Sequence, residues 1–468
     1  MSSRGTLALV AFAIALGLYV WLVEIRGAEQ KVEAESAARV IFAIEPASVT
    51  GLTLPTSDGR TAVVARASEG EWRLESPVAY PADAAAVSRA LRVLEKLESS
   101  STIEPKPADL EAFGLGAERK TVELRAGAVA PRSVFLGANT PVDGGRYVEL
   151  ASDPKRIFTV PAASLADLEP TLVALRDKRL LRLPTKSISE LTVRSGSALV
   201  ARAVKTDAGW SLVEPEAAPA DAEKITRLLD DLALARASGF EDQAKPRASY
   251  GLATPAREIN VRAGESEERL AIASADGKTW LERGGDPVVL EVNELVLSNV
   301  PAKFFDYRAK RVLTLDVASV HALEIAFPRS GQSQRLKRDG EVWKSEQPGV
   351  VLKPVVVEDL LFAIAALDAT SLIEASSERA AIGLEPPLAS IRAYDEKGAL
   401  LGEVSFGDPH PETGLPAFSS QSPSVWRVSN DIGREVPLSP EAFTNLLVQS
   451  PPAPAPLPSA DPKAPATP

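Results

Sequence analysis

The chain has 468 residues, of which 45% are hydrophobic and 25% are charged, and its formal net charge is -11. Compact domains usually hold about 100 to 150 residues, so the length predicts roughly three domains. The acidic balance argues against a nucleic-acid partner, because binding to a phosphate backbone depends on Lys and Arg displacing counterions. The chain has no cysteine, which excludes disulfides, thiolate metal sites and thiol nucleophiles.

The first element is an apolar stretch at residues 6–23, TLALVAFAIALGLYVWLV, which contains no charged side chain. As a helix rising about 1.5 Å per residue it would measure roughly 27 Å, close to the hydrocarbon thickness of a bilayer. Its distal end lacks the small residues of a cleavage site, so we expect an uncleaved anchor rather than a signal peptide or a buried core helix. Arg4 and the terminal amine precede the stretch. The positive-inside rule then favours a single-pass protein of the inner (cytoplasmic) membrane with the bulk of the chain in the periplasm.

Two landmarks recur along the rest of the chain. A Trp followed five residues later by Pro occurs three times, at Trp72 and Pro77, Trp210 and Pro215, and Trp343 and Pro348. An aromatic residue or Ile followed by Gly-Leu also occurs three times, at residues 113–115, 250–252 and 382–384. The Trp spacings are 210 - 72 = 138 and 343 - 210 = 133, and the Gly spacings are 251 - 114 = 137 and 383 - 251 = 132. Because both landmarks share one period, the sequence predicts three tandem copies of one unit.

Each copy begins with a predicted strand and continues into a predicted helix. The opening strands are residues 49–54, 188–193 and 320–325, and a second polar-apolar run then leads into the Trp. Eleven residues past the Trp we expect a helix start, with Asp83 and Asp221 as N-caps and Pro354 in the first turn of the third copy. The apolar positions that follow predict one buried face per helix: Val87, Leu91 and Leu94; Ile225, Leu228, Leu229 and Leu232; Val357, Leu360, Leu361, Ile364 and Leu367.

The second half of each copy predicts a meander of short strands. Gly114, Gly251 and Gly383 end short helical stretches and suit a left-handed position, since no phosphate-binding glycine pattern surrounds them. Alternation then returns at 122–124, 259–261 and 391–393, and further strands are expected at 134–137, 404–407, 158–160, 290–292 and 426–428. Strand pairs, one long amphipathic helix and a meander predict an α+β unit with an antiparallel-rich sheet.

Two similar basic segments close the first two copies. They read Lys178-Arg179-Leu180-Leu181 and Lys310-Arg311-Val312-Leu313, and their spacing, 310 - 178 = 132, matches the period of the other landmarks. The third copy has no such segment. Because the basic segment occurs only where another copy follows, we interpret it as a connection between domains. After Ser450 the chain becomes a Pro/Ala-rich stretch that we expect to be disordered. The predicted organisation is an anchor and juxtamembrane linker at 1–39, repeat units at 40–181, 182–312 and 313–449, and a tail at 450–468.

Candidate sites are few. The three repeated tryptophans are expected in the core rather than as platforms for sugar rings. Trp280 and Tyr147, whose spacing is 280 - 147 = 133, are the candidate ligand or interface residues. The stretch Asp408-Pro-His410-Pro-Glu412 is a conceivable cation site but is expected to be a loop. We predict no catalytic residue, no cofactor and no metal, because no carboxylate falls at one matching position in all three copies beside an acid-base partner.

The pattern of Trp and Pro, a helix start eleven residues past the Trp and an aromatic-Gly-Leu turn resembles the family called domain of unknown function 4340. Trp72, Pro77, Asp83 and residues 113–115 carry this resemblance in the first copy, while Pro354 and Ile382 depart from it in the third. The resemblance covers about residues 44–447. It implies an exported, membrane-tethered bacterial protein, often encoded beside an ABC-type transporter of the gliding-motility or ABC-2 export kind, with no assigned activity.

The expected function is therefore a non-enzymatic accessory or scaffold protein of the bacterial envelope. Its partners would be the membrane, through residues 6–23, and ABC transporter subunits or other envelope proteins, with no nucleic acid. A module that binds envelope glycans or peptides is the alternative, with Trp280 or Tyr147 as platforms. A hydrolase that uses a single unit is the third hypothesis, and it would need a cleft with paired titratable groups of perturbed pKa.

Overall fold

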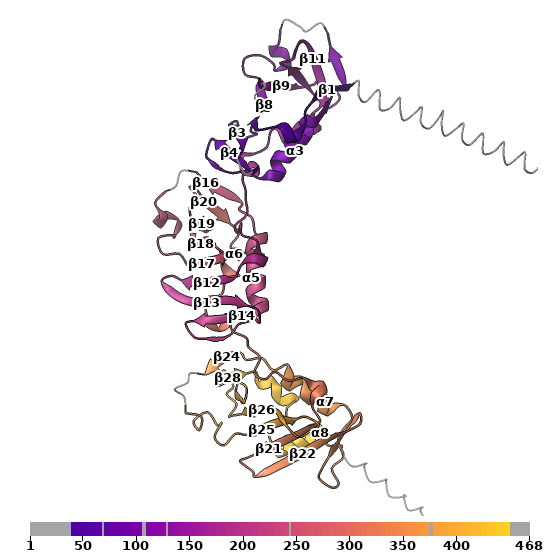
Figure 1. Cartoon of the computed structure of the whole chain (residues 1–468), viewed down its shortest axis with the longest axis vertical. Helices are drawn as coiled ribbons and strands as arrows, with labels where there is room; N and C mark the ends of the chain where they lie inside the picture. The colour runs from indigo at the N-terminus through magenta and orange to yellow at the C-terminus, as the bar shows by residue number, and fades with distance from the viewer. Residues whose placement is uncertain are drawn as a thin grey trace, which may run out of the picture. The chain divides into compact units, whose positions relative to one another are not determined.

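The computed structural model describes residues 39–449, apart from 68–69, 105–108, 128–129, 243–244 and 374–377. The expected anchor at 6–23 and the tail at 450–468 lie outside these residues. Within the described residues, no helix is both long and apolar enough to cross a bilayer. The contacts divide the chain into two units, Met1–Arg202 with Thr226–Ala302 and Ala203–Ile225 with Lys303–Pro468. The chain is α+β and mostly antiparallel sheet, as predicted (Figure 1).

The first sheet has nine strands in the order β5-β4-β3-β2-β8-β9-β10-β11-β7. A separate two-stranded sheet pairs β1 (Val40–Ala43) with β6 (Lys96–Glu98). The opening strand predicted at 49–54 is confirmed as β2. The strands of the nine-stranded sheet are β2 (Gly51–Pro55), β3 (Thr61–Arg66), β4 (Trp72–Ser76), β5 (Tyr80–Pro81), β7 (Ser101–Ile103), β8 (Lys120–Arg125), β9 (Arg132–Asn139), β10 (Gly145–Leu150) and β11 (Asp153–Pro161).

The second sheet has the order β15-β14-β13-β12-β17-β18-β19-β20-β16, and the division between the two units falls within β13. Figure 1 shows α5 (Ala222–Leu234) beside this sheet. The predicted strands at 188–193, 259–261 and 290–292 are confirmed. The strands are β12 (Glu190–Ser195), β13 (Ala198–Thr206), β14 (Gly209–Glu214), β15 (Ala218–Pro219), β16 (Gly239–Glu241), β17 (Arg257–Ala263), β18 (Ser266–Ala275), β19 (Lys278–Arg283) and β20 (Val289–Val292).

The third sheet has eight strands in the order β23-β22-β21-β25-β26-β27-β28-β24. Strand for strand this is the order of the other two sheets, except that among the described residues nothing corresponds to β5 and β15 beyond β23. The predicted strands at 320–325, 404–407 and 426–428 are confirmed. The strands are β21 (Ala322–Phe327), β22 (Gln332–Asp339), β23 (Val342–Ser345), β24 (Ser371–Ile373), β25 (Ala389–Tyr394), β26 (Leu400–Phe406), β27 (Leu415–Ser419) and β28 (Val425–Val428).

One longer helix accompanies each sheet: α3 (Ala84–Glu95), α5 and α7 (Val356–Ala365). All the apolar positions predicted to form their inner faces are buried, and so are Trp72, Trp210 and Trp343. The remaining helices are short: η2 (Pro46–Ser48), η3 (Glu111–Phe113), η4 (Ala162–Leu168), α4 (Leu172–Leu175), η5 (Thr185–Ser187), η6 (Arg247–Tyr250), α6 (Leu295–Ser298), η7 (Phe304–Tyr307), η8 (Val317–Ser319), η9 (Asn430–Arg434) and α8 (Pro440–Leu447).

The N-caps confirm two of the three predicted helix starts and correct the third. The Asp83 carboxylate accepts the Ala86 N–H and the Asp221 carboxylate accepts the Lys224 N–H, each at 2.9 Å. Pro354, in contrast, does not lie in the first turn of α7, because the helix begins at Val356 after a left-handed N-cap at Val355.

Backbone hydrogen bonds show which residue before α7 is equivalent to Asp83 and Asp221. The backbone N–H groups of Asp83, Asp221 and Lys353 all donate to the chain segment that follows the last strands of their own copy, at 2.8 Å. Lys353, not Pro354, is therefore the counterpart of Asp83 and Asp221. Its offset from Trp343 is 353 - 343 = 10, whereas the offset of Asp83 from Trp72 is 83 - 72 = 11. The equivalent position therefore comes one residue earlier after Trp343, but α7 begins three residues after Lys353, whereas α3 and α5 begin one residue after Asp83 and Asp221. This later start leaves Pro354 outside the helix.

The three Gly-Leu turns have the predicted backbone conformation. Gly114, Gly251 and Gly383 have φ values of 63°, 72° and 74°, in the left-handed region that glycine enters without a Cβ clash. At Gly114 an added Cβ would also lie 2.6 Å from the Ala138 backbone nitrogen. The turn thus needs glycine both for its φ angle and for the close approach of β9.

Candidate functional site: the joints between consecutive sheets

The segment that follows α4 bonds to residues on both sides of it in the sequence. We call residues 175–182 the first joint. Toward the first sheet, the Asp83 N–H donates to the Leu175 carbonyl at 2.8 Å and the Asp177 N–H donates to the Pro81 carbonyl at 2.9 Å. Toward the second sheet, the Ala237 N–H donates to the Lys178 carbonyl at 2.8 Å. The first joint therefore satisfies backbone groups of two successive parts of the chain at once.

The second joint, residues 307–314, repeats this arrangement at an offset of 307 - 175 = 132 along the sequence. Its backward bonds run from the Asp221 N–H to the Tyr307 carbonyl at 2.8 Å and from the Ala309 N–H to the Pro219 carbonyl at 2.9 Å. Its forward bond runs from the Ala369 N–H to the Lys310 carbonyl at 2.8 Å. Both joints thus use the same carbonyls and amides at equivalent positions.

At the end of the third copy, only the bonds to the preceding residues of the same copy are found among the described residues. The Lys353 N–H donates to the Leu447 carbonyl and the Gln449 N–H donates to the Val351 carbonyl, both at 2.8 Å. Val448 bridges Leu352 as Arg176 bridges Ala82 and as Arg308 bridges Ala220. An arginine therefore stands at this position only in the two joints that lead to a further sheet.

Arg176 is the most buried charged side chain of the first joint, with 1% of its surface exposed. Its Nη1 donates to the Asp242 carboxylate at 2.5 Å. Its guanidinium carbon lies 5.0 Å from the Phe240 ring centroid and 5.9 Å from that of Tyr80. Nε and Nη2 have no hydrogen-bond partner among the described residues, so the rings supply the remaining contacts. The guanidinium joins a residue of the first sheet to two residues around β16.

A second buried arginine, Arg283, extends this polar cluster. It donates from Nη1 to the Arg179 carbonyl at 2.7 Å, from Nη2 to the Tyr80 hydroxyl at 2.6 Å, and from Nε to the Asp286 carboxylate at 2.7 Å. Arg182 in turn donates to Asp286 at 3.2 Å. The charges are therefore paired and hydrogen-bonded, which is what burial of charged groups requires.

Two acid groups of the cluster have shifted pKa values. Burial raises the pKa of the Tyr80 hydroxyl to about 12, against the opposing effect of Arg283. For Asp177 burial also acts to raise the pKa, but the hydrogen bonds and charge of Arg179, together with the charge of Arg182, outweigh it and hold the pKa below its usual range. Both pKa values are moved away from 7, so Tyr80 stays neutral and Asp177 stays ionised at neutral pH. The cluster therefore suits a structural contact better than proton transfer.

The second joint carries Arg308 at the position of Arg176. Its Nη2 donates to the Ser424 hydroxyl at 2.6 Å, and its guanidinium carbon lies 4.9 Å from the Trp426 ring centroid. The carboxylate of Glu216, 3.6 Å away, is 65% exposed. This arginine also lies against an aromatic ring, but its acidic partner is much better solvated than Asp242.

The basic segments predicted from the sequence lie in the two joints, but the buried residues of the joints were not predicted. The side chains of Lys178-Arg179 and Lys310-Arg311 are half-buried or exposed. The buried arginine precedes each pair by two positions, in LRDKRLL and YRAKRVL. Aligning these two segments in full would have shown this arginine as a third shared cation.

The two candidate ligand residues lie in aromatic pairs. Trp280 on β19 is 8% exposed and packs edge-to-face on Tyr250 with ring centroids 5.0 Å apart. Tyr147 on β10 is half-buried and packs edge-to-face on Phe113 at 4.8 Å. Each pair joins the aromatic residue before a Gly-Leu turn to a strand of the same sheet, so the repeated spacing has a packing reason.

The stretch from Asp408 to Glu412 is a surface loop. Asp408 forms an ion pair with Arg329 at 2.7 Å, and His410 Nδ1 accepts the backbone N–H groups of Glu412 and Thr413 at 3.3 Å. Among the described residues, no three His, Cys, Asp or Glu side chains are grouped as a metal site would need. Asp408 and His410 are thus engaged with the protein itself.

The comparisons with known proteins gave one match. A family model described as "Domain of unknown function (DUF4340)" matches residues 72–209 and 210–387. The two adjacent matches start at Trp72 and Trp210, the landmarks that define the first period of the sequence. Neither the curated proteins nor the solved structures contain a match.

Proposed function

This chain belongs to the family of the domain of unknown function DUF4340, which assigns it no activity, and we propose that it is a non-enzymatic, membrane-anchored scaffold or accessory protein of the bacterial envelope. In this proposal the chain consists of three tandem copies of one unit, each an antiparallel-rich sheet with one amphipathic helix. Residues 6–23 anchor it in the inner membrane, and the copies project into the periplasm.

The pair of joints is the observation that carries this proposal. Each joint hydrogen-bonds backward to one copy and forward to the next, and each buries an arginine against an aromatic ring of the next copy. Buried, paired charges contribute little net stability compared with apolar packing, but they penalise any arrangement that separates the partners. Favouring contact between successive copies in this way suits a protein whose task is to present surfaces to partners.

An ABC-type transporter of the gliding-motility or ABC-2 export kind is the proposed partner, on the strength of the family resemblance alone. The experiment is affinity purification of the full-length protein from detergent-solubilised membranes, followed by mass spectrometry. The proposal expects transporter subunits or another envelope complex to be recovered in fixed proportion. Recovery of the protein alone, in several detergents and after cross-linking in the intact cell, would contradict it.

A separate experiment tests on which side of the membrane the copies lie. Because the chain has no native cysteine, a single introduced Cys can be labelled without background. A single Cys introduced at the exposed Ser164 should react in intact cells with a thiol reagent that passes the outer membrane but not the inner membrane. Labelling only after the inner membrane is permeabilised would place the copies in the cytoplasm and overturn the topology. The glycan- or peptide-binding alternative would need a surface other than Trp280, whose ring has little exposed face.

A further inference from the structure

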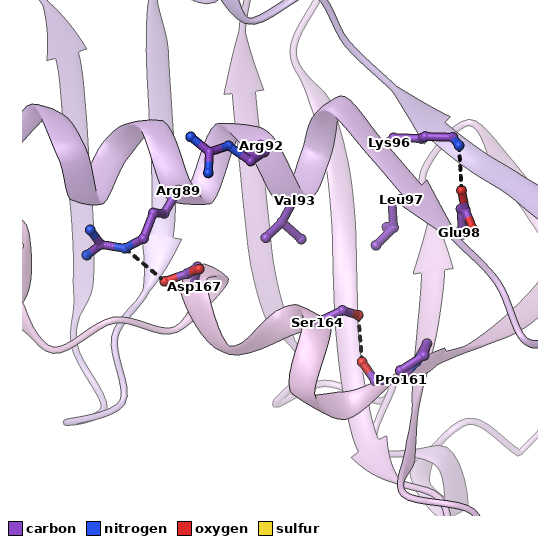
Figure 2. A pocket seen from close by; sticks show the side chains of 9 residues that line it. All are labelled: Arg89, Arg92, Val93, Lys96, Leu97, Glu98, Pro161, Ser164 and Asp167. Atoms are coloured by element: carbon purple, nitrogen blue, oxygen red, sulfur yellow. Dashed lines mark hydrogen bonds and ion pairs between the residues drawn. The ribbon is translucent and has the colours of Figure 1, made fainter.

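A groove runs along the exposed side of α3 in the first copy. We call it the α3 groove; it has a volume of about 420 Å3 and lies between α3, β6 and η4 (Figure 2). Val93, Leu97 and Pro161 form its apolar part. Three cations line it: Arg89 and Arg92, about one turn apart on α3, and Lys96, which follows the helix as the first residue of β6. Residues at i and i+3 share one helix face, so the groove combines an apolar floor with three neighbouring cations.

The cations of the α3 groove are only partly neutralised. Arg89 lies 3.3 Å from the Asp167 carboxylate and Lys96 lies 2.8 Å from Glu98, as the dashed lines in Figure 2 mark. Arg92 is exposed and has no acidic partner among the described residues. Because exposed ion pairs of this kind are weak, a phosphate could compete for Arg89 and Lys96 as well.

The other copies lack this basic face. With Asp83, Asp221 and Lys353 as equivalent positions, the counterparts of Arg89, Arg92 and Lys96 are Arg227, Asp230 and Leu234 on α5 and Asp359, Phe362 and Ala366 after Lys353. The set of three cations is thus specific to the first copy. It stands out further because the whole chain carries a net charge of -11.

The first copy is also the one that follows the expected anchor. Its two-stranded sheet places Ala43 of β1 opposite Lys96 of β6, so the first strand lies beside the groove. Between the end of the anchor at residue 23 and Val40 the chain can extend at most about 60 Å. The α3 groove is therefore tethered within reach of the membrane surface.

We propose that the α3 groove binds the headgroup phosphates of anionic phospholipids in the membrane that the anchor crosses. The three cations complement the phosphates, and the apolar floor can accept the glycerol and upper acyl groups of a lipid. The net negative charge of the rest of the protein disfavours other faces against the same surface. This inference rests on the anchor of the proposed function.

The test uses the full-length protein reconstituted into vesicles. A fluorophore is attached to Cys at Ser164, an exposed residue of the groove, and its quenching by spin-labelled lipid headgroups is measured. Vesicles of phosphatidylcholine alone are compared with vesicles that also contain phosphatidylglycerol. Quenching should be strong only with phosphatidylglycerol and should fall at high salt, because the Debye length shortens.

The matched variants are Arg89→Gln/Arg92→Gln/Lys96→Gln in the groove and Arg194→Gln/Lys205→Gln/Arg227→Gln elsewhere, which remove the same charge. Each cation near an anionic surface contributes about a fivefold factor, so the groove variant should lose roughly a hundredfold in the ratio of docked to undocked protein. The control variant should behave as wild type. Equal quenching in neutral vesicles, or equal loss in both variants, would overturn the proposal.

Flotation of the same vesicles separates this result from a failure of the anchor. If all variants float with neutral vesicles but none shows charge-dependent quenching, the anchor stands and the α3 groove is refuted. If the protein does not float with neutral vesicles, the anchor of the proposed function fails.

Discussion

Replacing Arg176 with Met tests whether the buried guanidinium holds the first joint closed. Removing one partner of a fully buried ion pair costs about 3–5 kcal/mol. The Asp242 side chain is 22% exposed, so water can solvate part of the released charge, and Met refills part of the space beside Phe240. We therefore expect Arg176→Met to destabilise the joint by about 2–3 kcal/mol.

The second joint provides the comparison. Arg308 has a solvated partner in Glu216, at 65% exposure, and one hydrogen bond to the neutral Ser424 hydroxyl. Arg308→Met should therefore cost only about 1 kcal/mol. Changing Asp242 to Leu in the Arg176→Met protein should restore most of the loss at the first joint, because no buried charge is then left without a partner.

Hydrogen exchange of two backbone amides measures these losses in the stability of the two joints. The Ala237 amide bonds to the first joint and the Ala369 amide bonds to the second. Where exchange reports local opening, about 2–3 kcal/mol corresponds to a roughly 30- to 150-fold faster exchange at Ala237, against about fivefold at Ala369 for Arg308→Met. Arg194→Met, at an exposed site, should change neither amide. Unchanged exchange at Ala237 in Arg176→Met, or equal acceleration in both variants, would refute the reasoning.

Three further predictions concern single residues. Because the pKa of Tyr80 is raised to about 12, its contribution to stability is fully present below the usual pKa of 10 and should be lost as the pH rises from 10 to 12, by about 2–3 kcal/mol. Tyr80→Phe should abolish this loss in denaturant titrations, and a variant with the wild-type alkaline slope would contradict the assignment. Gly114→Ala should lower the stability by about 3 kcal/mol, since its φ of 63° is unfavourable for Ala and the added Cβ would lie 2.6 Å from the Ala138 nitrogen. Gly59→Ala also has a positive φ but an open site, so it should lower the stability by only about 1 kcal/mol. Equal losses would show that the close approach to Ala138 does not matter. Val355→Gly should raise stability by about 1 kcal/mol in the same assay, because a β-branched residue at φ 67° is strained, and a decrease would contradict this.

Much of the fold followed from the sequence because the Trp and Gly landmarks each recur three times along it. The Trp and Gly landmarks located the strands on either side of them, and the Asp N-caps located α3 and α5. An N-cap is a local signal, since its carboxylate bonds to an amide in the first turn of the same helix. The α+β class and the antiparallel sheets were predicted from the same recurring order of strands, helix and strands.

The third helix start was predicted wrongly because α7 begins three residues after Lys353, whereas α3 and α5 begin one residue after Asp83 and Asp221. Pro354 suits a helix start on local grounds, but Val355 adopts a left-handed φ of 67° and the helix begins only after it. The apolar face carries the one-position shift of Lys353, since Val357, Leu360, Leu361 and Ile364 all lie one position earlier than their counterparts on α5, but it does not mark where the first turn begins.

The buried arginines could not be predicted from periodicity. Whether Arg176 is exposed depends on Phe240 and Asp242, which lie far away in the sequence and belong to the next copy. An arginine beside Lys178 and Arg179 reads locally as a solvated basic segment. Only the tertiary contacts show which of these cations is removed from water.

The central claim is that the joints hold successive copies in the contact that a partner requires. The most direct test is the recovery of co-purifying envelope proteins by the full-length Arg176→Met/Arg308→Met variant, compared with wild type and with Arg194→Met, at equal expression in the membrane. The scaffold account predicts that the joint variant loses most of its partners while Arg194→Met retains them. Recovery of the same partners in the same proportion by all three proteins would contradict it.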